Sequence, residues 1–77
     1  MEIVIERLIQ RFVAGADVSI RAANEIEVAL DDYPDDDYLQ QTREMLAMYR
    51  PDGGEYLFDT AAITQRLIET LEHLKAV

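Results

Sequence analysis

Apolar residues recur at helical spacing in four stretches of this chain, and residues that break helices separate the stretches. In the first stretch, residues 2–14, the apolar positions follow the i, i+3, i+4, i+7 pattern of an amphipathic helix. Gly15 should end this helix, because glycine readily adopts the left-handed conformation after a last helical turn. The same reasoning predicts three further helices at 18–32, 36–49 and from about residue 60 to the C-terminus.

The residues between these stretches fit helix ends and turns. Pro34 should end the second helix, because proline disfavours helical geometry in the preceding residue. The run 50–54, Arg-Pro-Asp-Gly-Gly, collects turn-forming residues, so the chain should reverse there. Residues 55–58 are too few for a helix and are expected to be extended, with their rings over one end of the core. Side chains suited to cap the last three helices are Asp17 or Ser19, Asp35 to Asp37, and Asp59 or Thr60.

These features predict an all-α fold, a compact four-helix bundle with a short extended segment before the last helix. Residues 1–77 should form one domain, because a chain of this length buries only about 60–65% of its unfolded surface and cannot build a second core. The side chains expected to face inward are Ile5, Leu8, Ile9, Phe12, Ala22, Ile26, Ala29, Leu30, Tyr33, Leu39, Thr42, Met45, Leu46, Tyr49, Ile63, Leu67, Leu71 and Leu74.

Composition narrows the environment and the partners. The chain has no cysteine, which excludes disulfides and thiolate metal sites and favours a reducing, cytoplasmic location. The acidic start at residues 1–6 does not suit a signal peptide, and no stretch approaches the ~20 apolar residues of a membrane span. The formal charge of −9 repels nucleic-acid phosphates and anionic lipids, so neither nucleic acid nor membrane is expected as a direct partner.

The residue types that catalysis or metal binding needs are scarce. Ser19 is the one serine and has no neighbouring His-Asp pair or glycine elbow, so it is interpreted as a helix cap. His73 lies alone in the last helix, where a structural or surface role is expected. A calcium loop starting at Asp35 would need glycine and glutamate where Gln40 and Leu46 stand. We therefore expect no enzyme activity, no metal and no cofactor.

Negative charge is concentrated in the middle of the chain. No lysine or arginine lies between Ala22 and Thr42, although seven carboxylates do. Such a run either serves solubility alone or offers a docking surface for a basic protein. Tyr38 adjoins the run and is a candidate contact, since tyrosine is enriched at interfaces. The acidic residues of this interval are Glu25, Glu27, Asp31, Asp32, Asp35, Asp36 and Asp37.

The order of these features resembles the colicin D immunity protein family, small helical-bundle proteins that neutralise a tRNA-cleaving bacterial toxin. The likeness covers most of the chain. It includes the opening helix with Leu-Ile-Gln-Arg-Phe-Val-Ala at 8–14, a second helix after a short link, and a third that runs into the Pro-Asp turn at Pro51 and Asp52. Tyr-Leu-Phe-Asp at 56–59 then leads into a leucine-rich terminal helix.

This resemblance implies binding rather than catalysis. Such a protein offers carboxylates to the basic cleft where the toxin would hold tRNA phosphates, so the expected partner is the toxin's nuclease domain. Family members meet the toxin with acidic side chains on the segment running into the turn. Asp52 matches that pattern, whereas Ala47 and Arg50 depart from it, which leaves room for the central carboxylates to make the contact. The partner-binding candidates are Asp31, Asp32, Asp35, Asp36, Asp37, Tyr38, Asp52 and Glu55.

Two other readings remain open. A small helical adaptor or homodimer could cover an apolar stripe that includes Val4, Val28 and Ile68, so the chain is expected to be a monomer or a weak homodimer. An acyl-carrier-like protein would carry a phosphopantetheine arm on a serine. Residues 17–20, Asp-Val-Ser-Ile, faintly echo its attachment motif, but the Asp and Ser are not adjacent.

Overall fold

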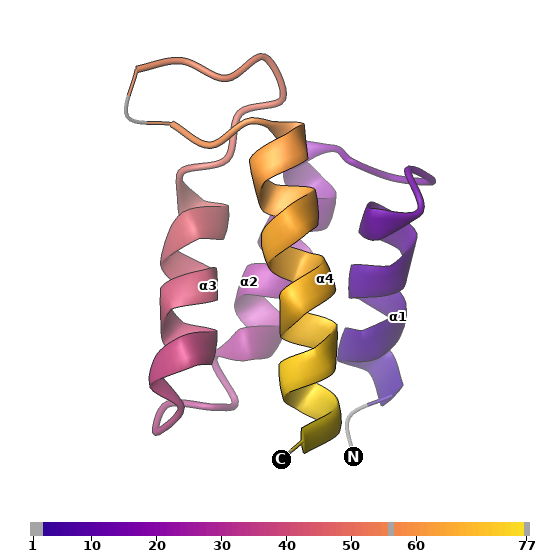
Figure 1. Ribbon diagram of the computed structural model, residues 1–77, viewed down its shortest axis with the longest axis vertical. Helices are drawn as coiled ribbons and strands as arrows, with labels where there is room; N and C mark the ends of the chain where they lie inside the picture. The colour runs from indigo at the N-terminus through magenta and orange to yellow at the C-terminus, as the bar shows by residue number, and fades with distance from the viewer. Residues whose placement is uncertain (1–2, 56, 77) are drawn as a thin grey trace.

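Four α-helices lie side by side in the computed structural model, which describes residues 3–55 and 57–76 (Figure 1). Consecutive helices run in opposite directions, and both ends of the chain lie at the same end of the bundle. Each helix packs against two others, so that α4 closes the bundle between α1 and α3. The predicted all-α, compact four-helix bundle is confirmed. The helices are α1 (Ile3–Val13), α2 (Ile20–Leu30), α3 (Asp37–Ala47) and α4 (Thr60–Ala76).

The helix starts follow from side-chain caps that the sequence predicted. The Ser19 hydroxyl accepts a hydrogen bond from the Ala22 amide at 3.1 Å, and the Asp17 carboxylate accepts one from the Ser19 amide at 3.2 Å. Because Ser19 is the cap, α2 begins at Ile20 rather than at residue 18. Asp59 caps α4 in the same way, through a 2.9 Å bond from the Ala62 amide.

The prediction was wrong about where α2 and α3 end. α2 stops at Leu30, two residues early, because the amides that follow bond three residues back: Asp31 to Val28 and Tyr33 to Leu30, both at 3.1 Å. This tighter winding satisfies the last carbonyls of the helix before Pro34 is reached. α3 likewise stops at Ala47, and the amides of the next two residues also bond three residues back.

The expected turns form, but the extended segment is shorter than predicted. Gly15 has φ +80° after α1, and the Gly53 amide bonds the Arg50 carbonyl at 2.8 Å. Phe58 is extended and pairs with the chain at Tyr49 in an isolated parallel bridge. Glu55 instead lies in a turn, and the Leu57 amide donates to the Gly54 carbonyl at 3.1 Å. Tyr56, which was also expected to be extended, lies outside the described residues.

The core confirms the helical pattern read from the sequence. At its centre Phe12 meets Tyr49 edge to face, with ring centroids 5.4 Å apart. The Tyr49 hydroxyl donates to the Val18 carbonyl at 2.6 Å and bonds the Thr60 hydroxyl at 2.8 Å, which ties the link before α2 and the start of α4 to the core. The predicted inward positions that are only partly buried against this core are Leu8, Ala29, Tyr33, Met45 and Leu71. The buried positions that the pattern missed are Ala23 and Thr70.

Among the described residues, no helix combines the length and apolar character that crossing a membrane requires.

Candidate functional site

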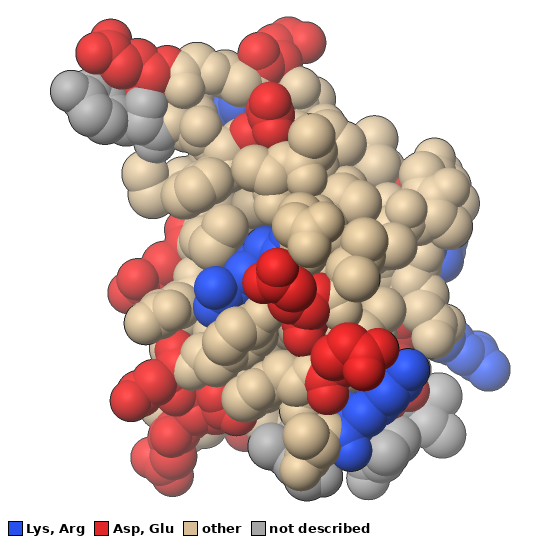
Figure 2. All heavy atoms as spheres, viewed as in Figure 1, with Lys and Arg blue, Asp and Glu red and all other residues tan. Residues whose placement is uncertain are grey.

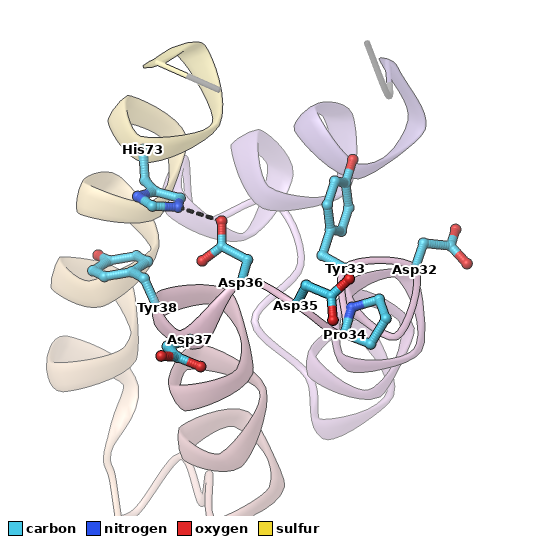
Figure 3. A pocket seen from close by; sticks show the side chains of 8 residues that line it. All are labelled: Asp32, Tyr33, Pro34, Asp35, Asp36, Asp37, Tyr38 and His73. Atoms are coloured by element: carbon cyan, nitrogen blue, oxygen red, sulfur yellow. Dashed lines mark hydrogen bonds and ion pairs between the residues drawn. The ribbon is translucent and has the colours of Figure 1, made fainter.

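The link between α2 and α3 carries four of the predicted binding residues, and a fifth, Asp37, is the first residue of α3. We call residues 31–37 the acidic loop. It lies at the end of the bundle that also holds both chain ends (Figure 1). Together with Tyr38 and His73, most of the loop lines a hollow that is open to solvent (Figure 3). The structure therefore brings the central carboxylates together on one end of the molecule.

Arginines just outside the acidic interval neutralise some of its charge. Arg43 reaches back to Asp31, with 3.2 Å between Nη1 and Oδ1, and Arg21 lies 3.6 Å from Glu25 along α2. Both pairs are on the surface, where such contacts stabilise a protein by at most about 1 kcal/mol. Their main effect is to reduce the local negative charge. Asp31 is therefore less available to a cationic partner than the sequence suggested.

Three carboxylates of the acidic loop differ from Asp31 and Asp36, which have charged partners. Asp32, Asp35 and Asp37 are exposed, and within residues 3–55 and 57–76 no basic side chain forms an ion pair with any of them. Figure 2 shows carboxylates gathered at the lower left, where Figure 1 places this loop, while the basic groups in view lie higher or to the right. These three side chains are the part of the site that is free to meet a cationic partner.

Asp36 differs from its neighbours because both of its oxygens have partners. Oδ1 accepts a hydrogen bond from the Leu39 amide at 3.1 Å, which caps α3. Oδ2 lies 2.7 Å from Nε2 of His73 on α4, and an ionised carboxylate only accepts, so Nε2 carries the proton (Figure 3). The hydrogen bond with His73 is the chief reason that the pKa of Asp36 is lowered, and the Leu39 amide adds to it. Asp36 therefore holds the loop in place, and its predicted role in partner binding stays a prediction.

The lowered pKa of Asp36 predicts how acid affects folding. A carboxyl whose pKa is lower in the folded than in the unfolded chain adds stability above its unfolded pKa, about 3.9. That contribution is lost as the pH falls through the folded value. Asn has one acceptor oxygen and cannot accept from both the Leu39 amide and His73, so we expect Asp36→Asn to be less stable than the wild type at neutral pH by about 1 kcal/mol, and the difference to shrink as the solution is acidified. Urea unfolding at a series of pH values measures this, and a difference that stays constant down to the lowest pH would contradict it.

Tyr38 is held by α4 on both faces of its ring. His73 stacks on the ring with centroids 4.5 Å apart and planes 20° from parallel, and Cζ of Arg66 lies 3.8 Å from the ring centre. Two groups this close cannot share one face, so the ring lies between them. Arg66 also donates to the Tyr38 carbonyl at 2.9 Å and to the Thr42 hydroxyl at 2.8 Å. The hydroxyl of Tyr38 is buried and has no hydrogen-bond partner among the described residues. Its predicted contact with a partner therefore rests on the ring edge that faces the hollow.

The other two predicted binding residues lie at the opposite end of the bundle. Asp52 and Glu55 are exposed on the link between α3 and α4, above the top of α3 in Figure 1. The eleven residues of α3 separate them from the acidic loop by about 16 Å. The predicted residues therefore form two groups rather than one patch.

An exposed stripe along α3 connects these two groups. Asp37, Gln41, Glu44 and Met48 are all exposed and follow one another at helical spacing. Glu44 was not predicted as a site residue, because it follows Arg43 and so lies outside the interval that has no basic residue. The sequence could have indicated Glu44, because it lies seven residues after Asp37 and therefore on the same face of the helix.

The arrangement offers little for other chemistry. Ser19 caps α2 at the end of the bundle opposite to His73, so the two do not meet. No group of three or more histidine, aspartate or glutamate side chains in the described part of the chain is arranged to hold a metal ion.

Comparisons with protein-family models, with curated proteins and with solved structures found no match to this chain.

Proposed function

We propose that this chain is an immunity-type protein that binds and blocks a basic bacterial nuclease toxin of the tRNA-cleaving class. The acidic loop takes the place that RNA phosphates occupy in the toxin's cleft. The observation that carries the proposal is the set of three carboxylates, Asp32, Asp35 and Asp37, that line one hollow and that no described basic side chain neutralises.

Electrostatics makes such a surface suited to a cationic partner. Like charges held together on one loop repel each other, and a basic cleft placed over them replaces that repulsion with attraction. The same field accelerates encounter and disfavours partners of negative charge. Solubility alone does not require the carboxylates to gather at one end of the bundle.

The likeness to colicin D immunity proteins supplies the class of partner. In that family the acidic contacts lie along the segment that enters the Pro-Asp turn. In this chain that segment is α3, whose outer face carries Asp37 and Glu44 and leads to Asp52. A toxin seated on the acidic loop would extend along this face, so both groups of predicted residues remain candidates for one interface.

One observation supports the alternative function, a small helical adaptor or homodimer. Val4 and Val28 are 62% and 67% exposed, and with Leu8 and Ala29 they line a groove on the outer faces of α1 and α2. A partner held by apolar contacts would use that face instead of the acidic loop.

Inhibition of tRNA cleavage distinguishes these readings. A panel of basic, tRNA-cleaving toxin nuclease domains is assayed with and without an equimolar amount of the chain. We expect the chain to abolish cleavage by at least one of them, and added salt to weaken the inhibition. If every nuclease keeps full activity while the folded chain is present in excess, the immunity proposal is wrong.

A further inference from the structure

We infer that His73 and Arg66 of α4 are positioning residues, which hold the acidic loop in the conformation that a partner meets. This inference rests on the proposed function, because it concerns how the same surface is presented. It assigns a role in binding to two side chains that are not among the predicted binding residues.

The first contact acts on the loop's last cap. Asp36 is the residue where the loop becomes α3, and its two oxygens are shared between α3 and α4: the Leu39 amide at 3.1 Å and Nε2 of His73 at 2.7 Å. The two side chains of the His73–Asp36 pair are 30% and 21% exposed, so water competes with the pair only in part. Movement of the loop at this point would break a hydrogen bond on each helix.

The second contact acts within the first turn of α3. Tyr38 inserts its ring between His73 and Arg66, which lie seven residues apart and thus on one face of α4. Arg66 also holds the backbone of Tyr38 through its carbonyl and bonds the buried Thr42 hydroxyl, which in turn lies 3.3 Å from that of Thr70. The contact of Arg66 with α3 is therefore connected to buried residues of the core.

The third contact acts at the loop's other side. The Gln40 side-chain amide donates to the carbonyls of Leu30 and Tyr33, at 3.3 and 2.9 Å, and Gln40 accepts from Arg43. Both sides of the acidic loop are thus fastened to α3, and α3 is fastened to α4. A partner that binds a loop already in place loses less conformational entropy than one that must order it.

For Arg66, the change in affinity expected from positioning is opposite to the change expected from charge alone. Removing Arg66 makes an acidic protein more acidic, so electrostatics alone predicts tighter binding of a cationic probe. Positioning predicts the opposite, since a loosened loop presents its carboxylates in many arrangements. Lys75, which is exposed and among the described residues is paired only with Glu72 on its own helix, provides a control with the same charge change.

The test measures affinity for a nona-arginine peptide at low ionic strength, together with amide hydrogen exchange of the free protein. The variants are Arg66→Met with Lys75→Met as its charge-matched control, and His73→Leu with His73→Gln, which retains a donor for Asp36. We expect Arg66→Met and His73→Leu to bind about fivefold more weakly, and the amides of residues 36–39 to exchange faster by a similar factor. We expect His73→Gln to stay close to the wild type, and Lys75→Met to bind at least as tightly.

The two readouts separate this inference from the proposed function. If the wild type binds the peptide and the folded His73→Leu and Arg66→Met proteins bind it equally or more tightly, with unchanged exchange at 36–39, the positioning role is overturned while the proposed function stands. If the wild type itself fails to bind, the proposed function fails, and the exchange rates alone then decide whether α4 holds the loop. Cooperative unfolding of each variant verifies that it is folded, and His73→Leu keeps the test valid if Arg66→Met is not.

Discussion

Replacing Phe12 with alanine is expected to lower the free energy of unfolding by about 3–5 kcal/mol. Phe12 is fully buried, and its ring meets that of Tyr49, which in turn bonds both the Val18 carbonyl and the Thr60 hydroxyl. Alanine removes the buried ring surface and leaves a cavity that the rigid helices around it cannot fill completely. A domain of this size has a total stability of only about 4–12 kcal/mol, so this variant should be partly or wholly unfolded at moderate temperature.

Thermal and urea unfolding of Phe12→Ala, followed by circular dichroism, measure this effect. Val28→Ala is the matched control, because Val28 is 67% exposed and its replacement should change the stability by no more than about 0.5 kcal/mol. Equal stabilities for the two variants would contradict the packing described for the core.

The sequence predicted the parts of the fold that depend on neighbours in the chain. Helical spacing found most buried positions of α1 to α4, and the caps at Ser19, Asp36 and Asp59 act over three residues, which a sequence displays directly. The ends of α2 and α3 were placed too late, because tight turns with bonds three residues back resemble a continuing helix in sequence. Thr70 was missed because a polar side chain was expected to face solvent. Its hydroxyl can be buried because it donates to the Arg66 carbonyl of the same helix.

The site depends more on contacts between distant residues, which no local pattern reveals. Asp35, Asp36 and Asp37 were all candidates for the cap of α3; Asp36 makes the local bond to the Leu39 amide, and its second bond comes from His73, 37 residues away, which no local pattern shows. Tyr38 was predicted to face a partner, yet α4 encloses its ring through Arg66, 28 residues further along. The arginine-free interval from 22 to 42 also overstated the free charge, because Arg43 lies just beyond it and folds back onto Asp31.

These distinctions change how the acidic surface should be tested. A variant that neutralises Asp36 together with its neighbours would alter a helix cap and the link to α4 as well as the charge. Asp32 and Asp35 are exposed and have no ion-pair partner among the described residues, so their replacement by asparagine changes charge with little effect on folding. Asp52 and Glu55 offer an equal change of charge at the opposite end of the bundle.

The most direct measurement is therefore the affinity of the nona-arginine peptide for Asp32→Asn/Asp35→Asn and for Asp52→Asn/Glu55→Gln, as a function of salt. We expect the first double variant to bind at least about tenfold more weakly than the wild type at low ionic strength, and to show a flatter salt dependence. The second should lose less affinity than the first, most clearly at about 0.15 M salt, where charges are screened over about 8 Å and its carboxylates lie at least about 16 Å along α3 from the acidic loop. If both double variants lose the same affinity, the peptide responds only to net charge, and the claim that the acidic loop is the docking surface is contradicted.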